Sequence, residues 1–373
     1  MLARGAIREY LDALVHRGKT PGIQYLAVHA TGPAFAHQAG WADVRNRVPM
    51  TADATMMAYS MSKTITAIAV LRLIEAGQIG IDDAAGRFVA HPYGPGVTVR
   101  HLLAHTSGIP NPIPLRWVHG TDRHATFDET AALAEVLAAR PTPTSAPGTR
   151  YRYSNIGYWL LGEIVERASG QPFTTFVTEQ VFAPLGIAPA DLAYAIPDRA
   201  RHARGYMEKY SLINLGKRFL VDGQLIGDYE GSWLRIRDHY PNGAAFGGLV
   251  GTARGFGKLL QDQLGMRSAA LGEVGRLLLY TQQRTVDGDT IPMTLGWHVG
   301  ELEGVRFFYK EGGGGGFHDE MRLYPSRGAG TIVMANATGF RVRKCLDEID
   351  RALVLPPYEA QSGAAEPEAA TAP

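Results

Sequence analysis

The sequence predicts a mixed α/β fold, with strands near both ends of the chain and helices between them. Two strand-like segments lie near the N-terminus, at 22–29 and 34–40, and four more lie between 297 and 336. Apolar residues recur at helical spacing over 62–77 and 158–169. At 373 residues the chain can bury a large core, and its length suggests two structural units.

Composition excludes several classes of function. Lysine plus arginine (37) nearly balance aspartate plus glutamate (36), so no basic surface for nucleic acid or an anionic membrane is expected. A single cysteine, Cys345, rules out an internal disulfide and a cysteine-based zinc site. No apolar run approaches the ~20 residues of a spanning helix. The first ten residues alternate charged and apolar types, unlike a signal peptide, so we expect an amphipathic helix and a cytoplasmic protein.

The first strand pair, 22–29 and 34–40, is expected to form a hairpin that turns at Gly32-Pro33. The helix over 62–77 follows, and it ends near Gly77. Ser60 and Lys63 stand at its start.

Ser60-x-x-Lys63 suits nucleophilic catalysis. Residues three apart on a helix share a face, so the amine of Lys63 can reach the hydroxyl of Ser60. A lysine serves as base only if its pKa falls from ~10.4 toward roughly 7–8, which burial and a second cation would favour. The alternative is an ordinary solvated helix start.

A short helix is expected between Thr98 and Gly108, with His101 and His105 four residues apart. That spacing could place two imidazoles on one face as metal ligands. The glutamate of a His-Glu-x-x-His zinc helix is absent, however, and no third ligand suggests itself. Packing or capping is therefore the expected role of both histidines.

The next helix is expected near 128–140, and a proline-rich stretch leads to Tyr153-Ser154-Asn155. These three residues precede the helix over 158–169, where side chains can project into a cleft while a rigid element holds them. Alternatively, Ser154 and Asn155 only cap that helix.

The segment 199–242 is long, aromatic and weakly periodic, as lids often are, and we expect it to line or cover the cleft. A helix over 254–264 comes next. Short strands then follow at 297–301, 305–309, 321–324 and 330–336. A last helix spans 342–354, and the tail 356–373 has nothing to bury and is expected to be disordered.

Lys310-Glu311-Gly312 opens a run of five glycines between two of these strands. A phosphate-binding loop does not fit, because no Gly-Lys-Ser/Thr follows. A flexible linker is the other alternative. Glycines between strands more often mark a close approach of the backbone to a ligand, so Lys310 could supply a fixed cation beside an exposed backbone N–H of Gly312.

In this order, Ser60-x-x-Lys63, Tyr153-x-Asn155 and Lys310-x-Gly312 resemble the three motifs of penicillin-binding proteins and β-lactamases. The chain is similar over nearly its whole length to the class C β-lactamase-like serine hydrolases, which include DD-peptidases and family VIII carboxylesterases.

The resemblance implies a β-lactamase/DD-peptidase-like fold, in which helices flank a central antiparallel sheet and a second region is mostly helical. The α/β region would comprise 1–57 and 285–355. The helical region, 58–284, would carry Ser60, Lys63 and Tyr153, with the active site in the cleft between the two regions.

The resemblance also implies a role for each motif residue. Ser60 is the acylated nucleophile, Lys63 its hydrogen-bonded partner, and Tyr153 a base and later an acid. Two flanking cations would lower the pKa of Tyr153 from ~10 toward neutrality. Asn155 would orient Lys63 or the substrate, and Lys310 would act on Tyr153 through its charge.

Backbone N–H groups of Ser60 and Gly313 would form the oxyanion hole. Trp297 could line the acyl pocket or belong to the core.

We therefore expect a cytoplasmic serine hydrolase of the carboxylesterase type that acts on a small ester or amide without cofactor or metal. Lys310 keeps β-lactam recognition open, because many family VIII esterases carry His or Trp there. The alternatives are a β-lactamase, a D-amino-acid peptidase or amidase, and a penicillin-binding sensor that is acylated without turnover. Nothing in the sequence gives the oligomeric state.

Overall fold

The computed structural model describes residues 2–112, 117–215 and 222–355. Within these ranges it is a mixed α/β protein with antiparallel sheets, as the sequence predicts. The predicted disordered tail, 356–373, lies outside the described residues. None of the helices described is long and apolar enough to cross a membrane.

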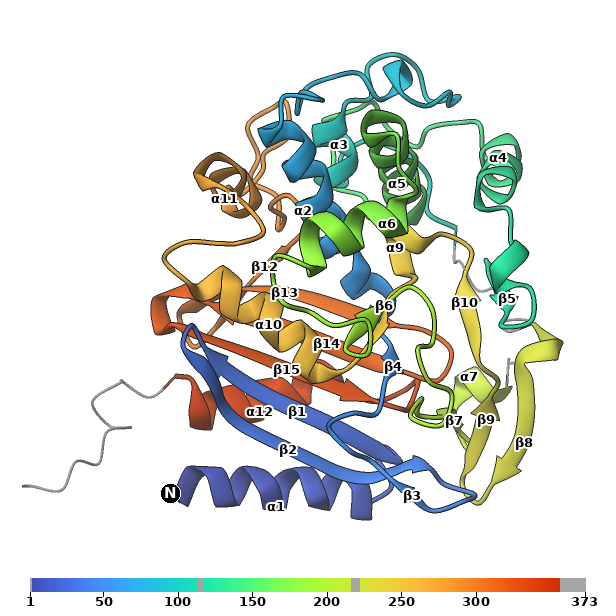
Figure 1. Cartoon of the computed structure of the whole chain (residues 1–373), viewed down its shortest axis with the longest axis vertical. Coiled ribbons are helices and arrows are strands. Elements are labelled where there is room, and N and C mark those ends of the chain that lie inside the picture. The colour runs from blue at the N-terminus through green and yellow to red at the C-terminus, as the bar shows by residue number, and fades with distance from the viewer. Residues whose placement is uncertain (1, 113–116, 216–221, 356–373) are drawn as a thin grey trace, which may run out of the picture.

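The main sheet has seven strands in the order β12-β13-β14-β15-β1-β2-β3. Its N-terminal strands are β1 (Gly22–His29), β2 (Gly32–Asp43) and the short β3 (Val48–Pro49). Strands from the two ends of the chain pair at its centre, where β1 runs antiparallel to β15 with Leu26 opposite Ile332. Figure 1 shows these blue and red strands side by side.

Of the four C-terminal strands of the sheet, the second and the third are longer than the sequence pattern predicts. They are β12 (His298–Leu302), β13 (Val305–Gly313), β14 (His318–Tyr324) and β15 (Ala329–Ala335). β13 continues through the Lys-x-Gly motif, where Gly312 pairs with Asp319 and Gly313 with His318 of β14.

The predicted hairpin forms, but its turn lies earlier than expected. Gly32 and Pro33 already belong to β2, where they face His29 and Val28 across a bulge. Proline fits there because the register shifts between Ala27 and Val28 and interrupts the regular ladder.

Helices cover both faces of the sheet (Figure 1). α1 (Leu2–His16) and α12 (Val342–Leu353) pack on one face, over Tyr25 and Val333. α10 (Ala253–Leu264) packs on the other, against β1 and β15. The division into an α/β region and a helical region, with boundaries at residues 57 and 285, stays a prediction. α10 comes from the segment between these boundaries, yet it packs on the sheet.

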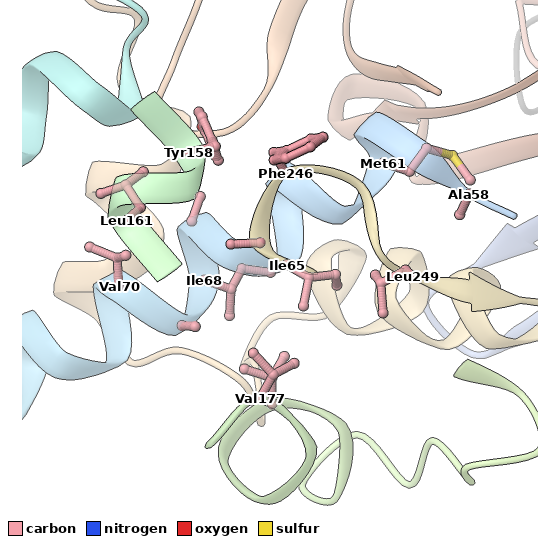
Figure 2. Packing of buried hydrophobic residues seen from close by; sticks show 14 of the residues in the cluster. Ala58, Met61, Ile65, Ile68, Val70, Tyr158, Leu161, Val177, Phe246 and Leu249 are labelled. Carbon is pink, nitrogen blue, oxygen red and sulfur yellow. The ribbon is translucent and has the colours of Figure 1, made fainter. Parts of the chain in front are cut away.

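The helical layer surrounds α2 (Ser62–Glu75), which is buried along almost its whole length. Figure 2 shows Ile65 and Ile68 of α2 among side chains from α5 (Asn155–Ser169), α6 (Phe173–Val177) and the segment around Leu249. α5 begins three residues earlier than predicted, because the side chain of Ser154 caps it by accepting the N–H of Gly157.

Shorter elements complete this layer. They are α3 (Val99–Leu103), α4 (Glu129–Ala139), α9 (Ala244–Gly247), α11 (Glu273–Tyr280) and the paired strands β4 (Met56–Met57), β11 (Val250–Gly251) and β6 (Leu192–Ala193). The described part of the excursion 199–242 contains four strands, β7 (Gly205–Glu208), β8 (Ile226–Glu230), β9 (Trp233–Ile236) and β10 (His239–Pro241), with the short helix α7 (Leu212–Leu215) after β7. β10 pairs with β5 (Val118–Gly120).

Candidate active site

The structure brings Ser60, Lys63 and Tyr153 together. Lys63 Nζ lies 3.0 Å from Ser60 Oγ, and the hydroxyl of Tyr153 donates to the same oxygen at 2.9 Å. Ser60 sits in a short 3₁₀ turn, Tyr59–Met61, that leads into α2. The backbone of Tyr59 is left-handed there, with φ of 41°, a strained geometry for a residue with a side chain.

Lys63 is fully buried, and the charges around it favour a neutral amine. Burial and then the neighbouring Lys310 hold the pKa of Lys63 well below its usual range. Its amine also donates to the carbonyl oxygen of Phe246, in α9, at 2.6 Å. A neutral lysine fixed in this way can accept the proton of Ser60.

Tyr153 differs from the prediction. Burial raises the pKa of Tyr153 instead of letting the two lysines lower it toward neutrality. The lysines do lie near its ring, at 5.0 Å for Lys63 Nζ and 5.3 Å for Lys310 Nζ. Because burial also lowers the pKa of Lys310, to about 7, the positive charge available to stabilise a phenolate is small. Tyr153 is therefore a phenol that donates a hydrogen bond.

One of the predicted supporting residues, Asn155, contacts a group other than those expected. Asn155 lines the catalytic cavity, but its side-chain amide donates to Asn111 Oδ1 at 3.1 Å, and the carbonyl of Phe246 takes the predicted place beside Lys63. Lys310 is fully buried behind Tyr153, and its Nζ has no hydrogen-bond partner among the described residues.

The glycines after Lys310 lie against the segment that carries Ser60. A Cβ on Gly312 would overlap the carbonyl oxygen of Ala58, and one on Gly314 would enter the ring of Tyr59. Only glycine allows this close approach. Ser60 and Gly313 consequently line the same cavity, as the predicted pair of oxyanion donors requires.

The cavity beside Ser60 measures about 340 Å³ and has mostly apolar walls. The excursion 199–242 contributes to it, but through residues that we did not predict. Its aromatic side chains from Tyr206 to Tyr240 are not among the described lining residues. The apolar side chains that line it are Trp117, Val118, Leu225, Ile236, Pro241 and Phe246.

Of the two roles left open for Trp297, the structure has the core. Its side chain is fully buried in the main core and is absent from the described cavity lining. Trp297 precedes edge strand β12, where its carbonyl accepts hydrogen bonds from Thr294. The next residue, His298, lies closer to the catalytic groups, with its ring 6.2 Å from that of Tyr153 and its Nε2 3.1 Å from the hydroxyl of Tyr151.

His105 holds the loop of Tyr153 in place, a role that sequence reasoning missed. The N–H groups on both sides of Tyr153 donate to it: Arg152 N to its carbonyl oxygen at 2.7 Å and Ser154 N to its Nδ1 at 3.1 Å. The two rings lie 4.3 Å apart. Burial keeps the pKa of His105 well below its usual range, so Nδ1 stays free to accept.

The other candidate metal ligand, His101, has a separate local role. Its side chain forms a reciprocal capping box with Thr98 at the start of α3. In the sequence, the only signal at His105 was that the short helix ends at the glycine three residues later. The contact of His105 with the loop of residue 153 cannot be predicted without the fold.

Comparison with known proteins places this geometry in a family. A sequence profile described as Beta-lactamase matches residues 7–355. The chain is 31% identical to penicillin-binding protein 4* of Bacillus subtilis (strain 168) over 164 residues, 43% of this chain and only 36% of that protein. It is 28% identical to penicillin-binding protein 4 of Amycolatopsis lactamdurans over 89% of this chain and 86% of that protein.

Solved structures show the same fold. The D-amino acid amidase from Ochrobactrum anthropi SV3, complexed with L-phenylalanine amide, matches with a TM-score of 0.79 at 22% identity, covering 94% of this chain and 98% of that one. The octameric penicillin-binding protein homologue from Pyrococcus abyssi matches with a TM-score of 0.76 at 23% identity, covering 94% and 77%. With its matching profile and this fold, the chain belongs to the beta-lactamase family of serine hydrolases.

Proposed function

We propose that the protein is a carboxylesterase that cleaves small esters with neutral, short to medium acyl chains through an acyl-enzyme on Ser60. The observation that carries this proposal is the cavity of about 340 Å³ beside Ser60. Its described lining contains no Asp, Glu, Lys or Arg side chain. Burial lowers the pKa of its one titratable base, His239, so this imidazole stays neutral as well. An apolar cavity without charge suits an uncharged acyl group.

The proposed reaction follows from the contacts around Ser60. Ser60 Oγ attacks the ester carbonyl while its proton passes to neutral Lys63. The N–H groups of Ser60 and Gly313 hold the developing oxyanion. Tyr153 then gives its proton to the departing alkoxide, and the lysine ammonium restores it. Water, deprotonated by the same groups, attacks the acyl carbonyl and releases the acid and free Ser60.

The two amide-cleaving alternatives have less support. A D-amino acid substrate carries an ammonium group, and a peptide or β-lactam substrate carries a carboxylate. Neither finds an opposite charge on the described walls of this cavity, because Lys310 is buried behind Tyr153. The likeness to a D-amino acid amidase supports the fold, and it leaves that activity as the second candidate.

A substrate panel with wild-type protein and Ser60→Ala tests the proposal. We expect hydrolysis of p-nitrophenyl acetate and butyrate, slower hydrolysis of the octanoate, and little turnover of nitrocefin or D-phenylalanine amide. Ser60→Ala should lose at least about a thousandfold of the esterase rate, because no other nucleophile among the described residues touches Lys63 and Tyr153. Preferential turnover of the amide or of nitrocefin would overturn the esterase assignment. A mass shift by nitrocefin without turnover would favour the sensor.

A further inference from the structure

A second cavity lies next to the catalytic one, on the other side of α9. It measures about 600 Å³ and is lined from α4, α5, α6, the segment 187–195 and β10. Ala244 and Gly248 face it, whereas Phe246 and Gly247 face the catalytic cavity, and of the described lining residues the two share only Pro241. α9 therefore separates two compartments.

The charged groups on the walls of this second cavity are acidic. Glu129, Glu166 and Glu179 line it, and no lysine or arginine is found among its described lining residues. The histidines His119 and His124 do not offset this charge, because burial lowers the pKa of both. Tyr240 adds an aromatic face, with its ring stacked on His124 at 3.7 Å.

Two polar groups inside the cavity have unused hydrogen-bonding capacity. Both carboxyl oxygens of Glu129 accept the backbone N–H of Ala244, at 3.1 and 3.2 Å, and the side chain of Trp159 is its other neighbouring donor, which leaves acceptor sites on the carboxyl group free. The hydroxyl of Tyr194 is buried without any hydrogen-bond partner among the described residues, although the side chain lines the cavity and is 8% exposed. The charge of Glu129 adds to burial in raising the pKa of Tyr194, which places the two groups close together.

We propose that this cavity is a second binding site, separate from the catalytic one, for a small organic ammonium ion with an aromatic or alkyl body. The ammonium group would donate to Glu129 and to the hydroxyl of Tyr194, and the body would lie against Tyr240. An acidic, aromatic pocket is the setting in which a partly desolvated cation is held by ion pairing and by the faces of aromatic rings.

The state of Glu129 gives this binding a distinctive signature. Burial raises the pKa of Glu129 to about 8, so in the empty cavity the carboxyl group is largely protonated at pH 7. A bound cation favours the ionised form, and binding at pH 7 must then release a proton. A neutral or anionic ligand releases none.

Calorimetric titration with benzylamine, benzyl alcohol and benzoate tests the proposal. We expect saturable binding of benzylamine, with a binding enthalpy at pH 7 that depends on the buffer's ionisation enthalpy. Benzyl alcohol should bind about tenfold more weakly and benzoate not at all. Glu129→Gln keeps an acceptor for Ala244 and should weaken benzylamine about tenfold, which corresponds to ~1.4 kcal/mol. Tyr194→Phe should weaken it about threefold.

Two matched variants locate the binding. Glu135→Gln removes an exposed carboxylate from the same helix, α4, and should leave the affinity unchanged. Leu225→Ala alters only the catalytic cavity of the two and should leave it unchanged as well. The proposal is overturned if wild-type protein binds no benzylamine, if benzoate binds equally, if Glu129→Gln and Tyr194→Phe bind like wild type, or if Leu225→Ala abolishes binding. Because no turnover is measured, the outcome is independent of the esterase assignment.

Discussion

At the scale of single residues, the candidate catalytic groups are two hydroxyls and two lysine amines that pack together. Among the described contacts, no carboxylate forms an ion pair with either lysine. Lys63 and Lys310 are both fully buried, and each has a lowered pKa. Since an uncompensated buried ammonium is costly, these lysines lose their protons more readily than usual, and one of them becomes a base.

The pH dependence should report this coupling. The proposed ester hydrolysis needs neutral Lys63, so kcat/KM should rise with pH through the pKa of Lys63. The charge of Lys310 lowers that pKa, and in Lys310→Met this contribution is lost. We therefore expect the acidic limb of the kcat/KM profile to move to higher pH in Lys310→Met. An unmoved limb would show that the two amines do not interact.

His105 offers a test of positioning as distinct from chemistry. His105→Ala removes the acceptor for Ser154 N and should lower kcat by about 10- to 100-fold, with little change in KM. His105→Asn should restore much of the rate, because Asn tolerates the left-handed backbone seen there, with φ of 56°, and offers an oxygen in place of Nδ1. His101→Ala is the control and should keep kcat. Equal rates for the Ala and Asn variants would exclude this role.

At the scale of elements, the site depends on contact between the end of β13 and the turn before α2. The motif residues of these elements could be predicted from sequence because Ser-x-x-Lys, Tyr-x-Asn and Lys-x-Gly are local patterns. The contacts of Lys63 with Phe246 and of the Tyr153 loop with His105 could not be predicted. The carbonyl of Phe246 is a backbone group with no sequence signature, and the Nδ1 of His105 reaches a loop almost fifty residues away.

Gly312→Ala tests the contact between β13 and the catalytic turn. The added methyl group would overlap Ala58 and push the strand end away from Ser60, so activity should fall by more than about a hundredfold. Gly5→Ala is the control: a methyl group added there, on α1, meets nothing within 4 Å, and alanine favours a helix, so activity should be kept. Full activity of Gly312→Ala would refute the close approach.

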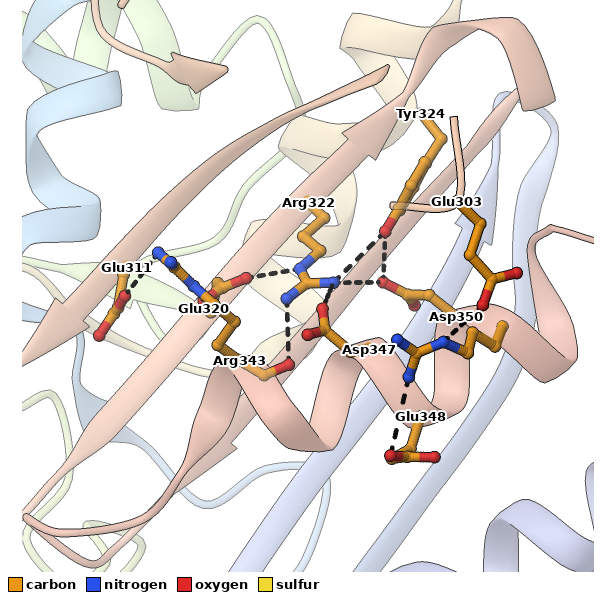
Figure 3. A network of polar contacts seen from close by, with 10 residues as sticks. Glu303, Glu311, Glu320, Arg322, Tyr324, Arg343, Asp347, Glu348 and Asp350 are labelled. Carbon is orange, nitrogen blue, oxygen red and sulfur yellow. Dashed lines mark hydrogen bonds and ion pairs between the residues drawn. The ribbon is translucent and has the colours of Figure 1, made fainter. Parts of the chain in front are cut away.

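A buried cluster of ion pairs and hydrogen bonds links α12 to the sheet (Figure 3). Arg322 of β14 is fully buried and contacts Glu320, Asp347 and Asp350, and the hydroxyl of Tyr324 donates to Asp350 at 2.7 Å. Removing this buried cation leaves Asp350 without a counter-charge and Glu320 with only Arg343, at 4.0 Å.

Arg322→Ala should therefore lower the free energy of unfolding by about 3–5 kcal/mol, measured by urea denaturation. Arg351→Ala, also on α12, removes exposed pairs with Glu303 and with Glu348 of the same helix and should cost less than about 1 kcal/mol. Similar losses for the two variants would contradict a structural role for the buried cluster.

At the scale of the whole molecule, the sheet lies between two hydrophobic cores, because successive side chains of a strand point to opposite faces. Leu26 and Val28 of β1 face the main core with α2 and α10, while Tyr25 and Ala27 face α1 and α12. Strand periodicity and helix amphipathicity were visible in the sequence, so strands near both ends of the chain and helices between them could be predicted, whereas the flanked sheet was implied by the family resemblance. The side chains of the excursion 199–242 that line the catalytic cavity could not be predicted, because tertiary packing decides that Leu225, before β8, and residues of β9 and β10 face it.

The pairing of β1 with β15 joins a strand that is synthesised early to one that is synthesised late. β1 and β2 leave the ribosome early, yet the central neighbour of β1 is made about 300 residues later. At roughly 5–20 residues per second, the hairpin waits on the order of 15–60 s with one edge unpaired. The nascent chain thus carries an open strand edge for most of its translation, and ribosome-bound holding chaperones or slowed elongation near the 3′ end of the message should change its yield more than its final activity.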